Sequence, residues 1–134
     1  MDVNGKLVQI NVDIDIVTAR QEGRTLASQL GFSSSEQVFI ATAISEAARN
    51  ILQYAGKGTI ALSALEEGTK RGILIVAQDT GPGIPDIEQA LIDGYSSSGG
   101  LGLGLSGMKR LMSELEIVSA VDKGTTLIMK KWVL

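Results

Sequence analysis

The chain has 134 residues, a formal net charge of -3 at pH 7, and 44% hydrophobic but only 4% aromatic residues. This length suits a single domain over residues 1–134 with an aliphatic core. The absence of cysteine and histidine excludes disulfides, thiolate zinc sites, histidine-based triads and a phosphohistidine of the chain's own. No basic block, long apolar run or leader segment is evident, so we expect no nucleic-acid partner, no membrane association and a cytoplasmic location.

The first half of the chain predicts one strand and two helices. Alternating apolar and polar residues predict a strand over 7–12, and helical spacing predicts a helix over 14–30 that ends before a glycine. Ser33 and Glu36 form a capping box for a second helix that runs to about residue 54. We expect its buried stripe to comprise Ile40, Ala43, Ile44, Ala47 and Ile51.

The second half predicts a hairpin, two helices and two further strands. The hairpin strands lie over 59–65 and 72–78, joined by a charged turn over 66–71. The remaining elements, in chain order, are a short helix over 86–92, a polar loop over 93–100, a helix over 103–114, and strands over 116–121 and 125–132. The expected fold is therefore an α/β (α+β) two-layer sandwich, with a mixed sheet covered on one face by helices.

The predicted second helix carries a carboxylate and an amide on the same face. Glu46 and Asn50 are four residues apart, so their side chains are neighbours on the helix surface. The amide oxygen of Asn50 suits Mg²⁺, which keeps several waters while it bridges substrate phosphates. The carboxylate of Glu46 could accept the proton of an attacking hydroxyl. The commoner explanation of such a pair is a solvated polar face.

A second polar segment follows the predicted strand over 72–78. Asp79 could accept a hydrogen bond from an exocyclic amine, and Gly81 and Gly83 would let a flat ring such as adenine approach the backbone. The alternative is an ordinary turn, since aspartate, glycine and proline all favour turns.

The third segment alternates glycine with leucine before the predicted helix over 103–114. Its glycines could present backbone N–H groups to phosphates, while the leucines anchor the loop and the helix offers its positive N-terminal end. A flexible linker would not interleave leucines in this way. The residues that we expect to contact nucleotide here are Gly99, Gly100, Leu101, Gly102 and Gly104.

Other glycine motifs fit this third segment poorly. Gly102, Gly104 and Gly107 match the dinucleotide-binding spacing, but three serines precede them where a buried strand is needed. A P-loop requires Gly-Lys-Ser/Thr, and the eukaryotic kinase set requires a histidine that the chain lacks. The remaining explanation of the glycine and leucine segment is a different ATP-binding fold.

Four boxes in order resemble those of the GHKL ATPase/kinase superfamily. They are Glu46-x-x-x-Asn50, Asp79-x-Gly81-x-Gly83, Gly100-x-Gly102-x-Gly104 and Gly124-Thr125. The resemblance implies a Bergerat-type fold in which Glu46 is the general base, Asn50 ligates Mg²⁺, Asp79 binds the adenine amine and Thr125 supports that contact. The loop over 93–100 would form a short ATP lid.

Within the superfamily, the chain is similar to the anti-sigma and switch kinases, which lack a histidine-bearing dimerisation region. This resemblance implies a serine/threonine kinase in a bacterial stress pathway that works by partner switching. It would phosphorylate a STAS-domain scaffold protein and then bind and activate a PP2C-type phosphatase. The alternatives are an anti-sigma factor that binds a sigma factor, and a nucleotide-gated module without transfer. Arg49 and Lys109 could contact phosphate or could be solvated surface charges.

Overall fold

The computed structural model describes residues 5–81, 104–120 and 124–134 of the chain. The short helix predicted over 86–92 and the loop predicted over 93–100 lie outside these residues. In chain order, the described elements are β1 (Lys6–Ile10), α1 (Ile14–Leu30), α2 (Ser34–Tyr54), β2 (Gly58–Glu67), β3 (Lys70–Asp79), α4 (Gly104–Leu111), β4 (Glu114–Ala120) and β5 (Gly124–Trp132).

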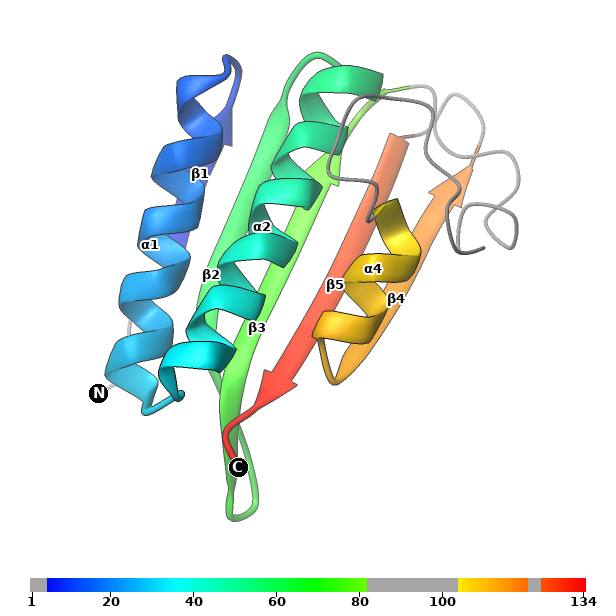
Figure 1. The fold of residues 1–134 in the computed structure, drawn as a ribbon. Helices are drawn as coiled ribbons and strands as arrows, with labels where there is room; N and C mark the ends of the chain where they lie inside the picture. Colours follow the sequence, from blue (N-terminus) through cyan, green and yellow to red (C-terminus); the bar gives the residue numbers. More distant parts are fainter. Residues whose placement is uncertain (1–4, 82–103, 121–123) are drawn as a thin grey trace.

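The described elements form two layers, which confirms the predicted sandwich. Five strands make one sheet in the order β1-β2-β3-β5-β4, and α1, α2 and α4 cover one face of it (Figure 1). Every strand pairing among the described residues is antiparallel, so the sheet is not mixed as predicted. Two successive helices join β1 to β2, and the second returns the chain to the end at which β1 finishes, so β2 runs opposite to β1 (Figure 1).

The two long helices begin and end as their sequences predict. α1 ends at Gly31, which adopts a left-handed conformation with φ 95°. At the start of α2, Ser33 Oγ accepts from the Glu36 N–H at 3.2 Å, and Glu36 Oε1 accepts from the Ser33 N–H at 3.3 Å. The predicted apolar stripe of α2 is entirely buried in the single core cluster between helices and sheet. Glycine at position 23 of α1 lets that helix pack closely against Ile44 of α2.

Two predicted boundaries near the first strand and the hairpin move for local reasons. β1 ends at Ile10 because the N–H groups of Asn11 and Val12 donate to the Asp15 carboxylate, at 2.8 and 3.0 Å. These two donors lower the pKa of Asp15. The hairpin turn is shorter than predicted because the charged residues over 66–67 and 70–71 pair across the β2–β3 ladder. The chain reverses at Gly68, where φ is 62°.

The helix predicted over 103–114 ends earlier, at Leu111. Lys131 of β5 donates from Nζ to the Leu111 carbonyl at 2.8 Å, and its ammonium lies 5.7 Å from the ring centroid of Phe39 in α2. The Ser113 N–H donates to the Lys130 carbonyl at 2.9 Å, so the chain has already joined the sheet before Glu114, the first residue of β4. One β5 lysine thus fixes the end of α4 against both layers.

Within residues 5–81, 104–120 and 124–134, no helix combines the length and apolar character that crossing a bilayer requires.

The capping box of α2 gives a direct test of the fold. Replacing Ser33 by alanine removes the acceptor for the Glu36 N–H, and we expect the free energy of unfolding to fall by about 1 kcal/mol. Urea denaturation followed by circular dichroism measures this change. Ser35→Ala is the matched control, since Ser35 is exposed in the first turn of the same helix. Equal losses in both variants would show that the box does not stabilise the helix.

Candidate active site

Four of the predicted site segments meet at one end of the sandwich. The C-terminal end of α2, the end of β3 and the start of β5 lie at the upper end in Figure 1, and α4 begins below them with its N-terminal end directed upward. These ends carry Asn50, Asp79, Gly104 and Thr125 respectively. The fold therefore brings together residues that are up to 75 positions apart in sequence, from Asn50 to Thr125.

The end of α2 packs directly against the aspartate turn, the segment from Asp79 to Gly81 at the end of β3. A Cβ built on Gly81 would lie 2.5 Å from the Ala55 Cβ and 3.2 Å from the Tyr54 carbonyl oxygen, both at the end of α2. Real Cβ atoms do not approach this closely, so only glycine fits at position 81 without a shift. A Cβ on Gly58 of β2 would likewise lie 2.8 Å from Ile51 Cγ2 of α2 and 3.2 Å from the Asp79 Cβ. The helix and the turn are thus fixed against each other.

The Asp79 carboxylate is held by backbone donors. Its Oδ1 accepts from the Gly81 N–H at 2.9 Å and from the Thr125 N–H at 3.3 Å. Asp79 and Thr125 are also register partners between β3 and β5. Among the described residues, Oδ2 has no donor, and the side chain is only partly buried. The arrangement leaves one oxygen of an oriented carboxylate able to accept from a ligand amine.

Behind Asp79, a serine that sequence reasoning missed supports Thr125. Ser119 Oγ lies 2.9 Å from Thr125 Oγ1 and donates to the Gly124 carbonyl at 3.1 Å. Gly124 has φ 83°, and a Cβ there would lie 2.8 Å from the Thr80 Cα, so its glycine is required by conformation and by space. Ser119 faces Thr125 across the β4–β5 ladder, a pairing that would have been predictable only with the register known.

The acid and the amide of α2 differ in their environment. Glu46 is only 3% exposed, which is inconsistent with the solvated polar face that we considered from the sequence. Its Oε1 accepts from Arg49 Nη1 at 2.9 Å, so Arg49 pairs with the acid. Asn50 is partly buried, and its amide has no partner in the described part of the chain.

Five residues that the sequence predicts to contact nucleotide belong to the segment between β3 and α4. Gly83, Gly99, Gly100, Leu101 and Gly102 lie outside the described residues, so their nucleotide contacts stay predictions. Gly104 is the first residue of α4, as expected of a helix that begins directly after the loop. Lys109 is exposed in the last turn of α4, where a cation interacts favourably with the helix dipole and is remote from the N-terminal end.

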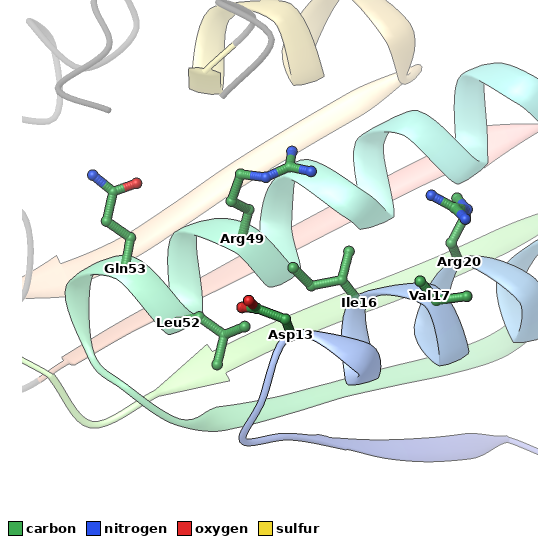
Figure 2. Close-up of a pocket in the computed structure, with 7 residues that line it drawn as sticks. All are labelled: Asp13, Ile16, Val17, Arg20, Arg49, Leu52 and Gln53. Atoms are coloured by element: carbon green, nitrogen blue, oxygen red, sulfur yellow. The ribbon is translucent and has the colours of Figure 1, made fainter. Parts of the chain in front are cut away.

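A separate groove of about 510 Å³ lies between α1 and α2 (Figure 2). On the α1 side it is lined by Asp13, Ile16, Val17 and Arg20. On the α2 side it is lined by Arg49, Leu52 and Gln53. Neither Glu46 nor Asp79 lines this groove, so it is not the nucleotide site that the motifs predict. Arg49 connects the two regions, since it lines the groove and pairs with Glu46.

The metal-ligating side chains of the described residues fit an ion that is also bound by substrate phosphates better than an ion held by protein ligands alone. In residues 5–81, 104–120 and 124–134, no three acidic side chains cluster to hold an ion. Asn50, one turn before the end of α2, has an amide oxygen with no hydrogen-bond partner among the described residues. Mg²⁺ is commonly held by one or two protein oxygens together with substrate phosphates and water.

Comparisons with known proteins show the family to which the chain is related. Residues 35–133 match the family described as histidine kinase-, DNA gyrase B-, and HSP90-like ATPases. The chain is 51% identical over 125 residues to serine/threonine-protein kinase RsbT of Bacillus subtilis, covering 93% of this chain and 94% of that protein. It is 32% identical over 117 residues to an anti-sigma F factor of Clostridium kluyveri, covering 84% and 82%.

A solved structure shares the fold at much lower sequence identity. The mycobacterial sensor histidine kinase MprB superposes with a TM-score of 0.56 over 96% of this chain and 97% of that one, at 17% identity. The resemblance that the four motifs indicated, including the similarity to the anti-sigma and switch kinases, is confirmed. The chain belongs to the histidine kinase-, DNA gyrase B- and HSP90-like (GHKL) ATPase family.

Proposed function

We propose that this protein is an ATP-dependent protein serine/threonine kinase, with residues 1–134 as one catalytic unit. The observation that carries the proposal is the packing of the end of α2 against the turn after β3, at the same end as the starts of α4 and β5. The helix that borders the oriented Asp79 carries a buried acid, Glu46, and the partly buried Asn50 amide, for which we propose a metal-binding role. The 51% identity to a serine/threonine-protein kinase supports the choice of reaction.

In the proposed reaction, the acceptor hydroxyl attacks the γ-phosphorus of ATP. Its proton passes to the Glu46 carboxylate, an O–P bond forms to the acceptor, and the bond to the β,γ-bridging oxygen breaks so that ADP leaves. Phosphoryl transfer depends mainly on positioning and charge neutralisation, so this sparse residue set is sufficient. The burial of Glu46 keeps the carboxylate out of bulk water.

Nucleotide recognition in this proposal begins at Asp79. Its Oδ2 accepts from the adenine amine while Oδ1 stays bound to the N–H groups of Gly81 and Thr125. The Thr125 hydroxyl, held by Ser119, lies beside this contact. The glycine and leucine loop up to Gly104 would surround the phosphates, with the N-terminal end of α4 directed at them.

Asn50 would hold Mg²⁺ together with the phosphates of ATP. When bound, the ion neutralises the charge that develops on the transferred group. The Asn50 amide is partly buried and has no hydrogen-bond partner among the described residues, so its oxygen is available as a metal ligand.

The proposed partners are proteins of a bacterial stress-signalling pathway in the cytoplasm. The acceptor is a serine or threonine on a STAS-domain scaffold, as in a stressosome, and the released kinase then binds and activates a PP2C-type phosphatase. Similarity to RsbT and to anti-sigma F factors supports a kinase that switches between protein partners.

A second candidate function is an anti-sigma factor with serine kinase activity. The 32% identity to an anti-sigma F factor favours considering it. The two functions share the ATP site and differ in the partner that is bound. Titration of the purified chain with a purified sigma factor and a purified PP2C-type phosphatase separates them.

The proposed transfer is tested by incubating the chain with radiolabelled ATP, Mg²⁺ and purified STAS-domain proteins. We expect Glu46→Gln to lower the transfer rate at least about 100-fold, because glutamine cannot accept the acceptor's proton. ATP affinity should stay unchanged, because the acid acts on the acceptor. Glu67→Gln, in the exposed hairpin, is the control and should keep the parent rate. Full transfer by Glu46→Gln would remove the acid from the mechanism.

Removing the Asn50 amide should weaken nucleotide binding through the metal. We expect Asn50→Ala to weaken Mg-ATP binding by about tenfold in calorimetry, with no change when the metal is chelated. Gln53→Ala is the control, since it removes an amide from the next turn of α2 that lines the groove between α1 and α2. This variant should bind Mg-ATP with the parent's affinity. An equal loss with and without Mg²⁺ would argue against a metal ligand.

Replacing Asp79 by asparagine should change the choice of nucleotide. Asparagine can keep its oxygen on the N–H groups of Gly81 and Thr125 while it presents an NH₂ group where the carboxylate oxygen stood. We expect ATP affinity to fall by about tenfold and the preference for ATP over GTP to shrink. Competition binding with the two nucleotides measures this. Equal binding of GTP and ATP by the parent would contradict the assignment.

A further inference from the structure

The buried acid of α2 has one cationic partner among the described residues. Glu46 is 3% exposed, and its Oε1 accepts from Arg49 Nη1 at 2.9 Å. A second ion pair, between Lys6 and Glu22, is longer at 3.8 Å, and its side chains are far more exposed. Arg49 is therefore not part of an ordinary surface pair.

Burial makes the Glu46 carboxylate depend on this contact. A carboxylate removed from water needs a charged or hydrogen-bonding partner, and loss of one partner leaves the charge uncompensated. Arg49 stands three residues further along the same helix, so the helix itself sets the spacing. A guanidinium donates from a rigid planar fork, which restrains the direction as well as the charge of the group it binds.

We propose that Arg49 is a positioning residue for phosphoryl transfer, which acts by fixing the Glu46 carboxylate in the orientation that accepts the acceptor's proton. The inference rests on the proposed kinase function and adds a residue to it. Proton transfer to a positioned base requires hydrogen-bond distance and alignment, and small displacements of reacting groups cost large factors in rate. Arg49 does not itself touch ATP or the acceptor in this account.

A competing role for Arg49 is contact with the acceptor protein through the α1–α2 groove. Figure 2 shows Arg49 and Arg20 on the two helices that bound this groove. The Arg49 side chain is 36% exposed, so part of it is accessible there. Arg20 lines the same groove and has no ion pair with Glu46, which makes Arg20→Met the matched control.

The experiment measures steady-state transfer from ATP to the purified STAS-domain acceptor. For Arg49→Met we expect kcat to fall by about 10- to 100-fold, with the KM for ATP and for the acceptor unchanged. Arg49→Lys should recover part of kcat, because it restores the charge without the planar fork. Arg20→Met should keep the parent kcat. A merely structural role would not produce a loss in kcat alone that lysine rescues.

A double-mutant cycle with Glu46→Gln decides whether Arg49 acts through the acid. If it does, adding Arg49→Met to Glu46→Gln produces no further loss in kcat. Independent, multiplying losses would overturn the inference. A higher KM for the acceptor in both Arg49→Met and Arg20→Met, at unchanged kcat, would also overturn the inference. That result would assign Arg49 to binding of the acceptor protein.

The remaining outcomes are also decisive. Thermal unfolding is measured for each variant to show that it folds. If Arg49→Met does not fold, the kcat values of Arg49→Lys and Arg49→Gln are compared with that of the parent instead. Absence of transfer by the parent chain would refute the proposed function and this inference with it. An active parent whose Arg49 variants keep full kcat would refute the inference alone.

Discussion

The close approach of α2 to the turn after β3 is the constraint on which the candidate site depends. Glycine at positions 58 and 81 leaves no side chain between the helix and the turn, so the end of α2 packs directly on the segment that carries Asp79. The same turn is tied to β5 by the Thr125 N–H and to its own backbone by the Gly81 N–H. Contacts that stabilise the fold therefore also orient the proposed adenine-binding carboxylate.

The sequence predicted the regular elements well where local signals were strong. The glycine after α1 fixed the end of that helix, and the capping box at Ser33 and Glu36 fixed the start of α2, since each satisfies backbone groups within a few residues. The predicted end of α4 was wrong because a tertiary contact determines where the helix ends. Lys131, twenty residues later, donates to the carbonyl of Leu111, the last residue of α4. The antiparallel pairing of β1 with β2 follows from the path of the two helices between them, which residue patterns alone do not reveal.

Motif spacing found the parts of the site but not the contacts between them. Glu46 and Asp79 were named from chemistry and position, yet the burial of Glu46 and its pairing with Arg49 required the packing of α2. Ser119 carried no local signal, because its role comes from facing Thr125 across two strands. The glycine and leucine loop up to residue 103 lies outside the described residues and remains a prediction from sequence.

The central claim is that the end of α2, the aspartate turn and the start of α4 form one nucleotide site. A crystal structure of the chain with Mg²⁺ and a non-hydrolysable ATP analogue tests it most directly. The account predicts the adenine amine on Asp79 Oδ2 and the ion between the phosphates and the Asn50 amide oxygen. A nucleotide bound in the α1–α2 groove, or anywhere away from Asp79 and Asn50, would contradict it.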